Sequence, residues 1–109
     1  MKSETHSNLK PQNVYSVSRL NRETRFLLND NFGRIWVEGE ISNLALPSSG
    51  HLYFTLKDYE AQIRCAMFRG QARQLGFQPE NGDHVLLQAE VSLYEPRGDY
   101  QLIVEWMVL

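Results

Sequence analysis

Aromatic and basic side chains share one side of the segment SSGHLYFTLKDYEAQIRCAMFRG, residues 48–70. Two strands joined by a short polar turn would place Tyr53, Lys57, Arg64 and Phe68 on the outward face, because strand side chains alternate. Aromatic rings stack on nucleobases and cations neutralise phosphates, so this combination is typical of single-stranded nucleic acid binding. Tyr and Phe also favour strands and pair across sheets with no ligand present, which leaves a purely structural role as the alternative.

The same segment is locally basic. Residues 57–73 contain four basic and two acidic side chains, a local charge of +2 in a chain whose formal net charge is −2. A chain of that net charge does not grip nucleic acid by bulk charge, so any such site must be local. We therefore add Arg69 to the predicted phosphate contacts. Most basic runs are simply solvated surface, and that alternative stays open.

The turn YEPRGDY, residues 94–100, is the second candidate contact region. Arg97 is predicted to contact phosphate, and Tyr94 or Tyr100 to supply a further stacking ring. The alternative is a plain hairpin turn in which Asp99 offsets the charge of Arg97.

Residue types that could perform catalysis are present but isolated. Glu38 and Glu40 share a strand face, but the sequence places no third ligand beside them, so we expect neither a metal nor a cofactor. Cys65 alternates inward with apolar neighbours and is expected to be a buried side chain and not a nucleophile. The serines and histidine of residues 48–51 have no acidic partner and are expected to shape a loop. No catalytic residue is therefore predicted.

The composition fits one domain of a cytoplasmic protein. The chain has 109 residues, 42% hydrophobic and 22% charged, which suits a single modest core. A lone cysteine excludes an internal disulfide and fits a reducing compartment. The polar N-terminus has no apolar signal region, and no stretch approaches the length of a membrane span, so no membrane association is expected.

The elements that must position these residues follow from periodicity. Residues 1–13 are predicted to be a disordered arm or leader, and residues 14–109 to form the domain. Residues 16–30 are predicted to form an amphipathic helix with Ser16 or Ser18 as N-cap and Gly33 as its stop. Its apolar side would comprise Val17, Leu20, Thr24, Leu27 and Leu28, with Arg19, Arg22, Arg25 and an exposed Phe26 opposite.

Five segments with period two follow the helix. They are residues 34–46, 51–58, 61–69, 83–95 and 100–107, with a short helix or helical turn expected between the third and fourth. Gly39 interrupts the first, where a bend or bulge is often needed. The inward positions predict a core that includes Phe54, Leu56, Ile63, Met67, Leu87 and Val91; the inward face of the last strand stays open.

This element order predicts an all-β fold, a five-stranded Greek-key OB-fold barrel. Such barrels present strands two and three, with the loops after strands one and four, to oligonucleotides or oligosaccharides. The outward aromatic and basic residues lie on that face.

Four sequence blocks also carry a resemblance. WVEGEISNL, SSGHLYFTLKD, IRCAMFRG and YEPRGDYQLIVE, in this order, resemble the N-terminal domain of the exonuclease VII large subunit, from about Tyr15 to Trp106. The resemblance implies an OB-fold that binds single-stranded DNA, while the nuclease centre lies in a separate, later domain. It also implies assembly with several copies of a small helical subunit into an exodeoxyribonuclease that degrades single-stranded DNA from both ends to oligonucleotides. We expect this fragment alone to be non-catalytic.

Two other functions remain open from the residues alone. The barrel face would equally suit an RNA-binding OB domain of the anticodon-reading kind, because stacking does not select the sugar. The acidic balance of the chain is compatible with a barrel used only for protein contact or assembly. The resemblance favours single-stranded DNA as the partner.

Overall fold

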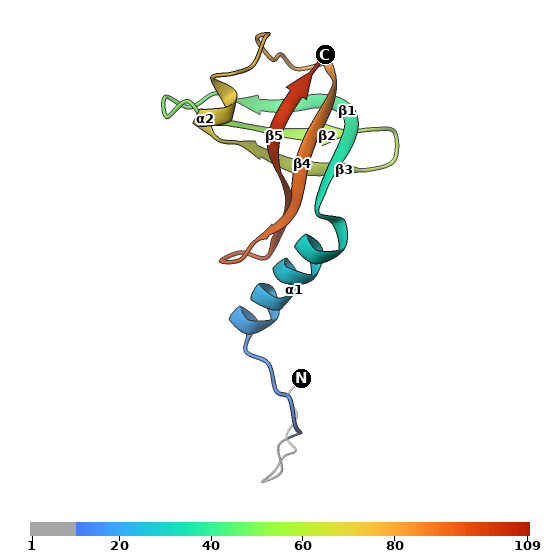
Figure 1. The fold of residues 1–109 in the computed structure, drawn as a ribbon, viewed down its shortest axis with the longest axis vertical. Helices are drawn as coiled ribbons and strands as arrows, with labels where there is room; N and C mark the ends of the chain where they lie inside the picture. The colour runs from blue at the N-terminus through green and yellow to red at the C-terminus, as the bar shows by residue number, and fades with distance from the viewer. Residues whose placement is uncertain (1–10) are drawn as a thin grey trace.

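The structure, a computed structural model, describes residues 11–109 (Figure 1). Most of the arm predicted over residues 1–13 therefore lies outside the described residues. Within the described part of the chain, no helix is long and apolar enough to cross a membrane.

Helix α1 (Val17–Phe32) begins and ends at the predicted caps. The Ser16 hydroxyl accepts a hydrogen bond from the Arg19 N–H at 3.1 Å, which satisfies one of the free donors of the first turn. At the other end Gly33 has φ 59°, and its N–H donates to the Asn29 carbonyl at 2.9 Å. Glycine tolerates this left-handed conformation without steric cost, so the helix ends there.

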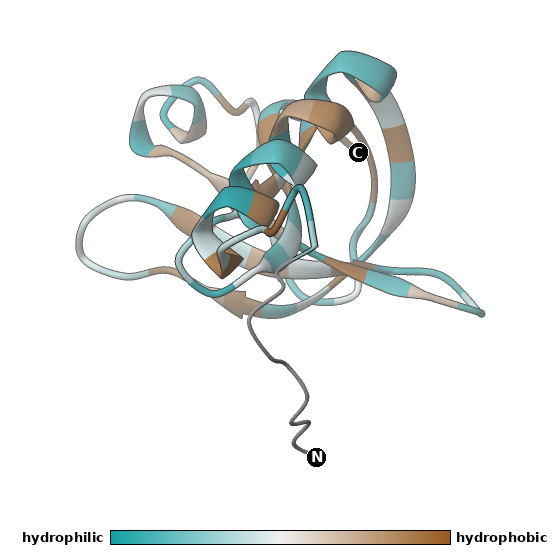
Figure 2. Ribbon diagram, turned by 90° about the horizontal axis from the view of Figure 1, so that it is seen from below, coloured by the Kyte–Doolittle hydropathy of each residue, from teal (hydrophilic) through white to brown (hydrophobic). Residues whose placement is uncertain are grey.

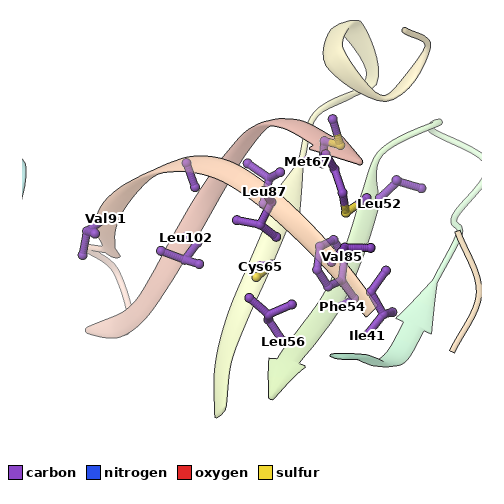
Figure 3. Close-up of a cluster of buried hydrophobic side chains, with 13 residues drawn as sticks. Ile41, Leu52, Phe54, Leu56, Cys65, Met67, Val85, Leu87, Val91 and Leu102 are labelled. Atoms are coloured by element: carbon purple, nitrogen blue, oxygen red, sulfur yellow. The ribbon is translucent and has the colours of Figure 1, made fainter. Parts of the chain in front are cut away.

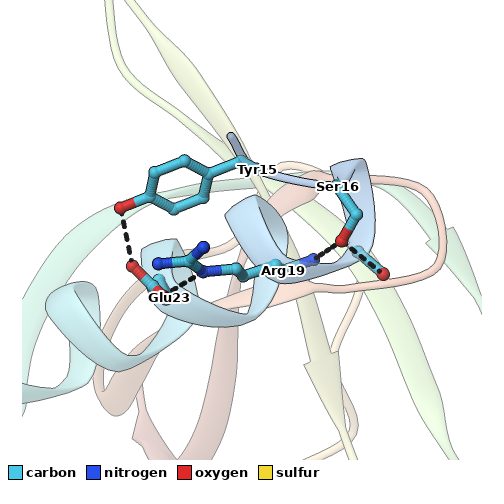
Figure 4. A network of polar contacts seen from close by, with 5 residues as sticks. Tyr15, Ser16, Arg19 and Glu23 are labelled. Carbon is cyan, nitrogen blue, oxygen red and sulfur yellow. Dashed lines mark hydrogen bonds and ion pairs between the residues drawn. The ribbon is translucent and has the colours of Figure 1, made fainter. Parts of the chain in front are cut away.

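A polar cluster fixes the first turns of α1 (Figure 4). The Glu23 carboxylate accepts from Arg19 Nε at 2.9 Å and from the Tyr15 hydroxyl at 3.0 Å. The Arg19 guanidinium also lies 4.1 Å from the centre of the Tyr15 ring. These contacts tie the segment before the helix to its second turn, and the hydrogen bond from Arg19 lowers the pKa of Glu23.

The predicted apolar face of α1 is wrong in part. Val17, Leu20 and Leu27 are exposed by 76%, 51% and 61%, and only Leu28 packs against the core. The physical reason is that the barrel closes on itself, so the helix packs mainly against β4 and the β4–β5 loop. Figure 2 accordingly shows hydrophobic bands on α1 at several positions around its surface. Phe26 is exposed, as predicted.

Five strands form a closed barrel in the order β1-β2-β3-β5-β4. The strands and the second helix are β1 (Arg34–Ala45), β2 (Leu52–Lys57), β3 (Gln62–Met67), α2 (Arg69–Ala72), β4 (His84–Tyr94) and β5 (Asp99–Val108). All neighbours are antiparallel except β3 and β5. This order, with the short helix between β3 and β4, confirms the predicted OB-fold.

Strand β1 pairs with two strands because it bends at Gly39. Its first half, residues 34–40, pairs with β4, and its second half pairs with β2. A Cβ at Gly39 would lie 2.9 Å from both the Leu56 Cγ and the Lys57 carbonyl oxygen. The close approach of β1 and β2 at this point therefore requires glycine, as the sequence predicted for a bend.

The barrel interior holds one continuous apolar core (Figure 3). The predicted members Phe54, Leu56, Met67, Leu87 and Val91 are each exposed by 4% or less. Ile63, also predicted to be buried, is only partly so, because it lies at the open end of the barrel in an apolar cleft.

The last strand contains an irregularity that hides its alternation in the sequence. Gln88 pairs with Trp106 while the next residue, Ala89, pairs with Val104, so Glu105 is an extra residue on β5. Val104 and Met107 therefore both point inward although three positions separate them.

The outer face of β1, β4 and β5 carries both tryptophans. Trp36, Gln88 and Trp106 form one cross-strand row, and the two indole side chains belong to residues exposed by 53% and 42%. Arg34 and Glu105 form an ion pair at 2.7 Å on the same strands. We refer to this surface as the tryptophan face.

Candidate nucleic-acid interface

A groove of about 590 Å³ runs over β2, β3 and β5 and contains four of the predicted site residues. They are Tyr53, Arg64, Tyr94 and Arg97. The four come from two strands, the end of a third strand and a loop, and closure of the barrel places them together. The groove also takes in the polar side chains of Asn43, Thr55, Asp99 and Gln101.

Cross-strand pairing explains the geometry of the groove floor. Thr55 pairs with Arg64, which in turn pairs with Gln101 across the parallel β3–β5 contact, so the three form one row. Tyr53 pairs with Ala66, one row along. Diagonal neighbours on a sheet lie about 7–8 Å apart, within reach of long side chains. An aromatic ring and a guanidinium are thus available side by side to a base and its phosphate.

Ala66 keeps the floor open beside the Tyr53 ring. Ala66 lines the groove, although only 6% of the residue is exposed. Its single methyl group leaves the space next to the ring free.

Sequence reasoning missed Asn43 and Gln101. Asn43 has φ 52° within a register shift of β1 between Ser42 and Ala45. Asparagine tolerates this conformation better than most residues, and an Asn inside an apolar alternating run is a detectable signal of a bulge. The Leu44 N–H that follows donates to the Asn81 side-chain oxygen at 2.9 Å, so a distant loop holds the bulge in place. Gln101 has no local signal, because its place depends on the pairing of β3 with β5.

Helix α1 anchors the β4–β5 loop at the edge of the groove. Asn21 Nδ2 donates to the Glu95 carbonyl at 2.9 Å, and Arg25 pairs with the Glu95 carboxylate at 2.8 Å. Within the loop, Arg97 contacts the Asp99 carboxylate at 3.3 Å, as the hairpin-turn alternative predicts. Both partners of that pair remain solvent-accessible, so a phosphate could compete with Asp99 for Arg97.

His51 joins the groove to the start of α2. Its ring centre lies 6.3 Å from that of Tyr53 and 5.5 Å from that of Phe68, edge to face in both cases. Its Nδ1 accepts a hydrogen bond from the Arg69 N–H at 2.9 Å, so the ring proton is on Nε2. Tyr53 and Phe68, exposed by 41% and 44%, are thus held at the rim of the groove by a histidine that shapes the loop.

The structure does not bring the other predicted residues into the groove. Phe68 stays at its rim and Arg69 lies beyond the rim, both next to His51. Lys57 is at the far end of β2, in a hollow with Glu38 and Glu40. Tyr100 lies on the opposite side of β5 from Gln101 and lines the apolar cleft at the barrel end.

The cations of β2, β3 and the α2 segment form no ion pair with a carboxylate of residues 11–109. Ion pairs neutralise Arg19, Arg25, Arg34 and Arg97. By contrast, Lys57, Arg64, Arg69 and Arg73 pair with no carboxylate of residues 11–109. Apart from Arg22 on α1, the unpaired positive charge of residues 11–109 is therefore on β2, β3 and the α2 segment, although the chain is acidic overall.

The hollow around Lys57 is larger than the groove but chemically unsuited to phosphates. Its volume is about 820 Å³, and its lining includes the carboxylates of Glu38, Glu40 and Asp58, with His84 opposite Glu40. Carboxylates repel a polyanion, so the smaller groove is the better candidate.

Cys65 and the acidic side chains are the residue types that catalysis or metal binding would use. Burial raises the pKa of the Cys65 thiol to about 12, so it stays protonated at neutral pH. Among residues 11–109 there is no group of three His, Cys, Asp or Glu side chains arranged to hold a metal ion.

Comparisons with known proteins identify the family of the domain. The family described as "OB-fold nucleic acid binding domain" matches residues 15–108. The Exodeoxyribonuclease 7 large subunit of Vibrio vulnificus (strain YJ016) is 58% identical over 101 residues, which is 93% of this chain and 23% of the relative. That of Enterobacter sp. (strain 638) is 58% identical over 94 residues, 86% of this chain and 21% of the relative. The chain thus spans less than a quarter of the length of these curated relatives.

A solved structure shows the same fold. The crystal structure of a putative aspartyl-tRNA synthetase from Leishmania major Friedlin superposes with a TM-score of 0.57 at 14% identity, over 93% of this chain and 22% of that one. The sequence resemblance to the exonuclease VII large subunit is confirmed by the relatives named above. The chain belongs to the family of OB-fold nucleic acid binding domains, in a form shared with exodeoxyribonuclease 7 large subunits.

Proposed function

We propose that this domain binds single-stranded DNA for an exodeoxyribonuclease VII large subunit. The observation that carries the proposal is the groove in which Tyr53, Arg64, Tyr94 and Arg97 meet. A stacking ring beside a cation without a carboxylate partner suits an unpaired base and its phosphate, whereas a duplex would hide the base faces.

The proposal extends to the biological setting of the full-length protein. In this proposal the full-length protein is cytoplasmic and works with a small subunit to degrade single-stranded DNA from both ends to oligonucleotides. The domain holds the strand, and the chemistry occurs elsewhere in the longer polypeptide. Support comes from the name of the relatives and from their length, roughly four times the matched region.

Fluorescence anisotropy with a labelled oligodeoxythymidine, titrated across salt concentrations, tests the proposal. Tyr53→Ala should lose about 1–3 kcal/mol of binding free energy with little change in salt dependence, because stacking releases few counterions. Arg64→Ala should lower the salt slope by about 0.7, the value for one phosphate contact on a single strand. Arg97→Ala should lower it less, since Asp99 already offsets part of its charge.

Competition experiments separate the alternatives. An RNA of the same sequence and a duplex should both compete less well than the DNA strand. Equal competition by RNA would favour an RNA-binding domain, and the absence of binding to every probe would favour a protein-contact barrel. Arg22→Ala on α1 is the matched control, because Arg22 is exposed, lies outside the groove and has no carboxylate partner among residues 11–109.

A further inference from the structure

A second cleft lies between the β1–β2 loop and α2, just beyond the rim of the groove. It has a volume of about 590 Å³, and its polar lining includes Ser48, Ser49, Arg69 and Arg73. In Figure 1 the β1–β2 loop and α2 are neighbours at one end of the barrel. Arg73 is the last of the four basic residues of residues 57–73, and it does not line the groove.

The charged side chains that line this cleft are both positive. No carboxylate belongs to the described residues that line it, and neither arginine has a carboxylate partner among residues 11–109. The groove, by comparison, includes Asp99. Two guanidinium groups with serine hydroxyls are donors that suit phosphate oxygens.

The loop holds Arg69 in place. A Cβ at Gly50, where φ is +89°, would lie 3.1 Å from the Arg69 Cγ and Cδ, so the arginine stem packs directly on the glycine. The Arg69 N–H donates to His51 Nδ1, which fixes the backbone of the same residue. Together these contacts place the Arg69 side chain against the loop before any ligand arrives, which reduces the entropy lost on binding.

The groove and the second cleft adjoin at the rings of Tyr53, His51 and Phe68. Tyr53 lines the groove, its neighbour Leu52 lines the second cleft, and His51 contacts both Tyr53 and Phe68 between them. A strand that leaves the groove over the Phe68 ring therefore reaches Arg69 and Arg73 next. At this position the exposed Phe68 ring can stack on a base between the phosphate contacts of the groove and those of the second cleft.

We propose that the cleft between the β1–β2 loop and α2 binds backbone phosphates of a single strand that continues past the groove, with Arg73 and Arg69 as the contacts. The inference rests on the proposed function, because the groove is where the strand begins. It predicts a binding site in two parts, of which a short strand can fill only the first.

Two oligodeoxythymidines test this, of about 4 and about 12 nucleotides, which span much of the range of site sizes for OB folds. Arg73→Ala should leave the affinity for the short probe unchanged. With the long probe it should lower the salt slope by about 0.7. The ratio of parent affinity to variant affinity should therefore rise about fivefold for each tenfold dilution of salt. Arg69→Ala should behave likewise, since its backbone N–H still bonds His51. Arg22→Ala, outside both clefts, is the control.

The outcomes separate the two proposals. If Arg73→Ala and Arg22→Ala have the same affinity and salt slope with the long probe, the second cleft does not bind phosphate. The proposal for the groove would be unaffected by that result. Equal loss by Arg73→Ala with both probes would also overturn the proposal for the second cleft, because one site would then hold both strands. A short probe with a 5′-phosphate that gains affinity only in the parent would show that the cleft takes a terminal phosphate and not a continuing backbone. If the parent binds neither probe, the proposed function itself fails.

Discussion

Phe54 and Phe68 are chemically identical residues on neighbouring segments with opposite environments. Phe54 is 4% exposed in the core and Phe68 is 44% exposed at the groove rim. Phe54→Ala should lower the free energy of unfolding by about 3–5 kcal/mol, since it leaves a cavity in the barrel. Phe68→Ala, the matched control, should cost at most about 1 kcal/mol. Urea denaturation measures both, and equal midpoints would mean that the inward and outward faces of the β2–β3 hairpin have been confused.

Asp58 stabilises the β2–β3 turn in a pH-dependent way. Its carboxylate accepts the N–H groups of Glu60 at 2.8 Å and Ala61 at 2.9 Å, and the bond from Glu60 is the largest cause of its lowered pKa. Because the pKa is lower in the folded state, the stabilisation is present above the ordinary carboxyl pKa and disappears as pH falls through the folded value. Asp58→Ala should therefore lower the melting temperature at pH 7 and have a smaller effect near pH 3. A destabilisation that is independent of pH would contradict this role.

At the scale of elements, the bend of β1 depends on one missing methyl group. A Cβ at residue 39 would meet the Leu56 side chain and a backbone carbonyl at 2.9 Å, and the carbonyl cannot move without disrupting the β1–β2 pairing. Gly39→Ala should destabilise the domain by about 1–3 kcal/mol, the usual cost of overpacking. Gly76→Ala is the control, because a Cβ there meets nothing within 4 Å. Thermal unfolding distinguishes the two variants, and a neutral Gly39→Ala would show that β1 does not need this close approach.

The elements were predictable where their causes are local. Strand alternation predicted the inward residues of β2 and β4, and the caps at Ser16 and Gly33 predicted the ends of α1. The buried side of α1 was not predictable, because periodicity identifies an apolar stripe but not whether the fold supplies a surface to cover it. The extra residue Glu105 likewise depends on a register with β4 that no local pattern encodes.

The candidate site was predictable in part for the same reason. Tyr53 and Arg64 share a hairpin, so alternation alone brings them to one face. Gln101 lines the groove, whereas Tyr100 lines the apolar cleft, because the groove edge depends on the long-range pairing of β3 with β5. The sequence thus identifies the central hairpin of the surface, and the closed barrel determines its edges.

At the scale of the whole molecule, paired and unpaired cations lie largely on different elements. Among residues 11–109, the cations without carboxylate partners lie on β2, β3 and the α2 segment, with Arg22 of α1 as the exception, while the other arginines of α1, β1 and the β4–β5 loop form ion pairs. An acidic chain can in this way present a locally positive surface. Because the net charge of the chain is negative, long-range electrostatic steering of a polyanion toward the groove should be weak. Compared with a strongly basic domain, salt should therefore act less on the association rate and relatively more on the dissociation rate.

The tryptophan face has an optical consequence. Trp36 and Trp106 lie outside the groove, and Trp106 is five residues along β5 from Gln101, about 17 Å at about 3.4 Å per residue. Nucleobases quench indole emission by contact, so the intrinsic fluorescence excited at the tryptophan band should stay constant while an oligodeoxythymidine saturates the domain. A Tyr53→Trp variant should be quenched in the same titration, since its indole would lie in the groove. Quenching in the parent would instead mean that the strand binds on the tryptophan face of β1, β4 and β5. The two native tryptophans therefore report whether the ligand contacts this face and not the groove.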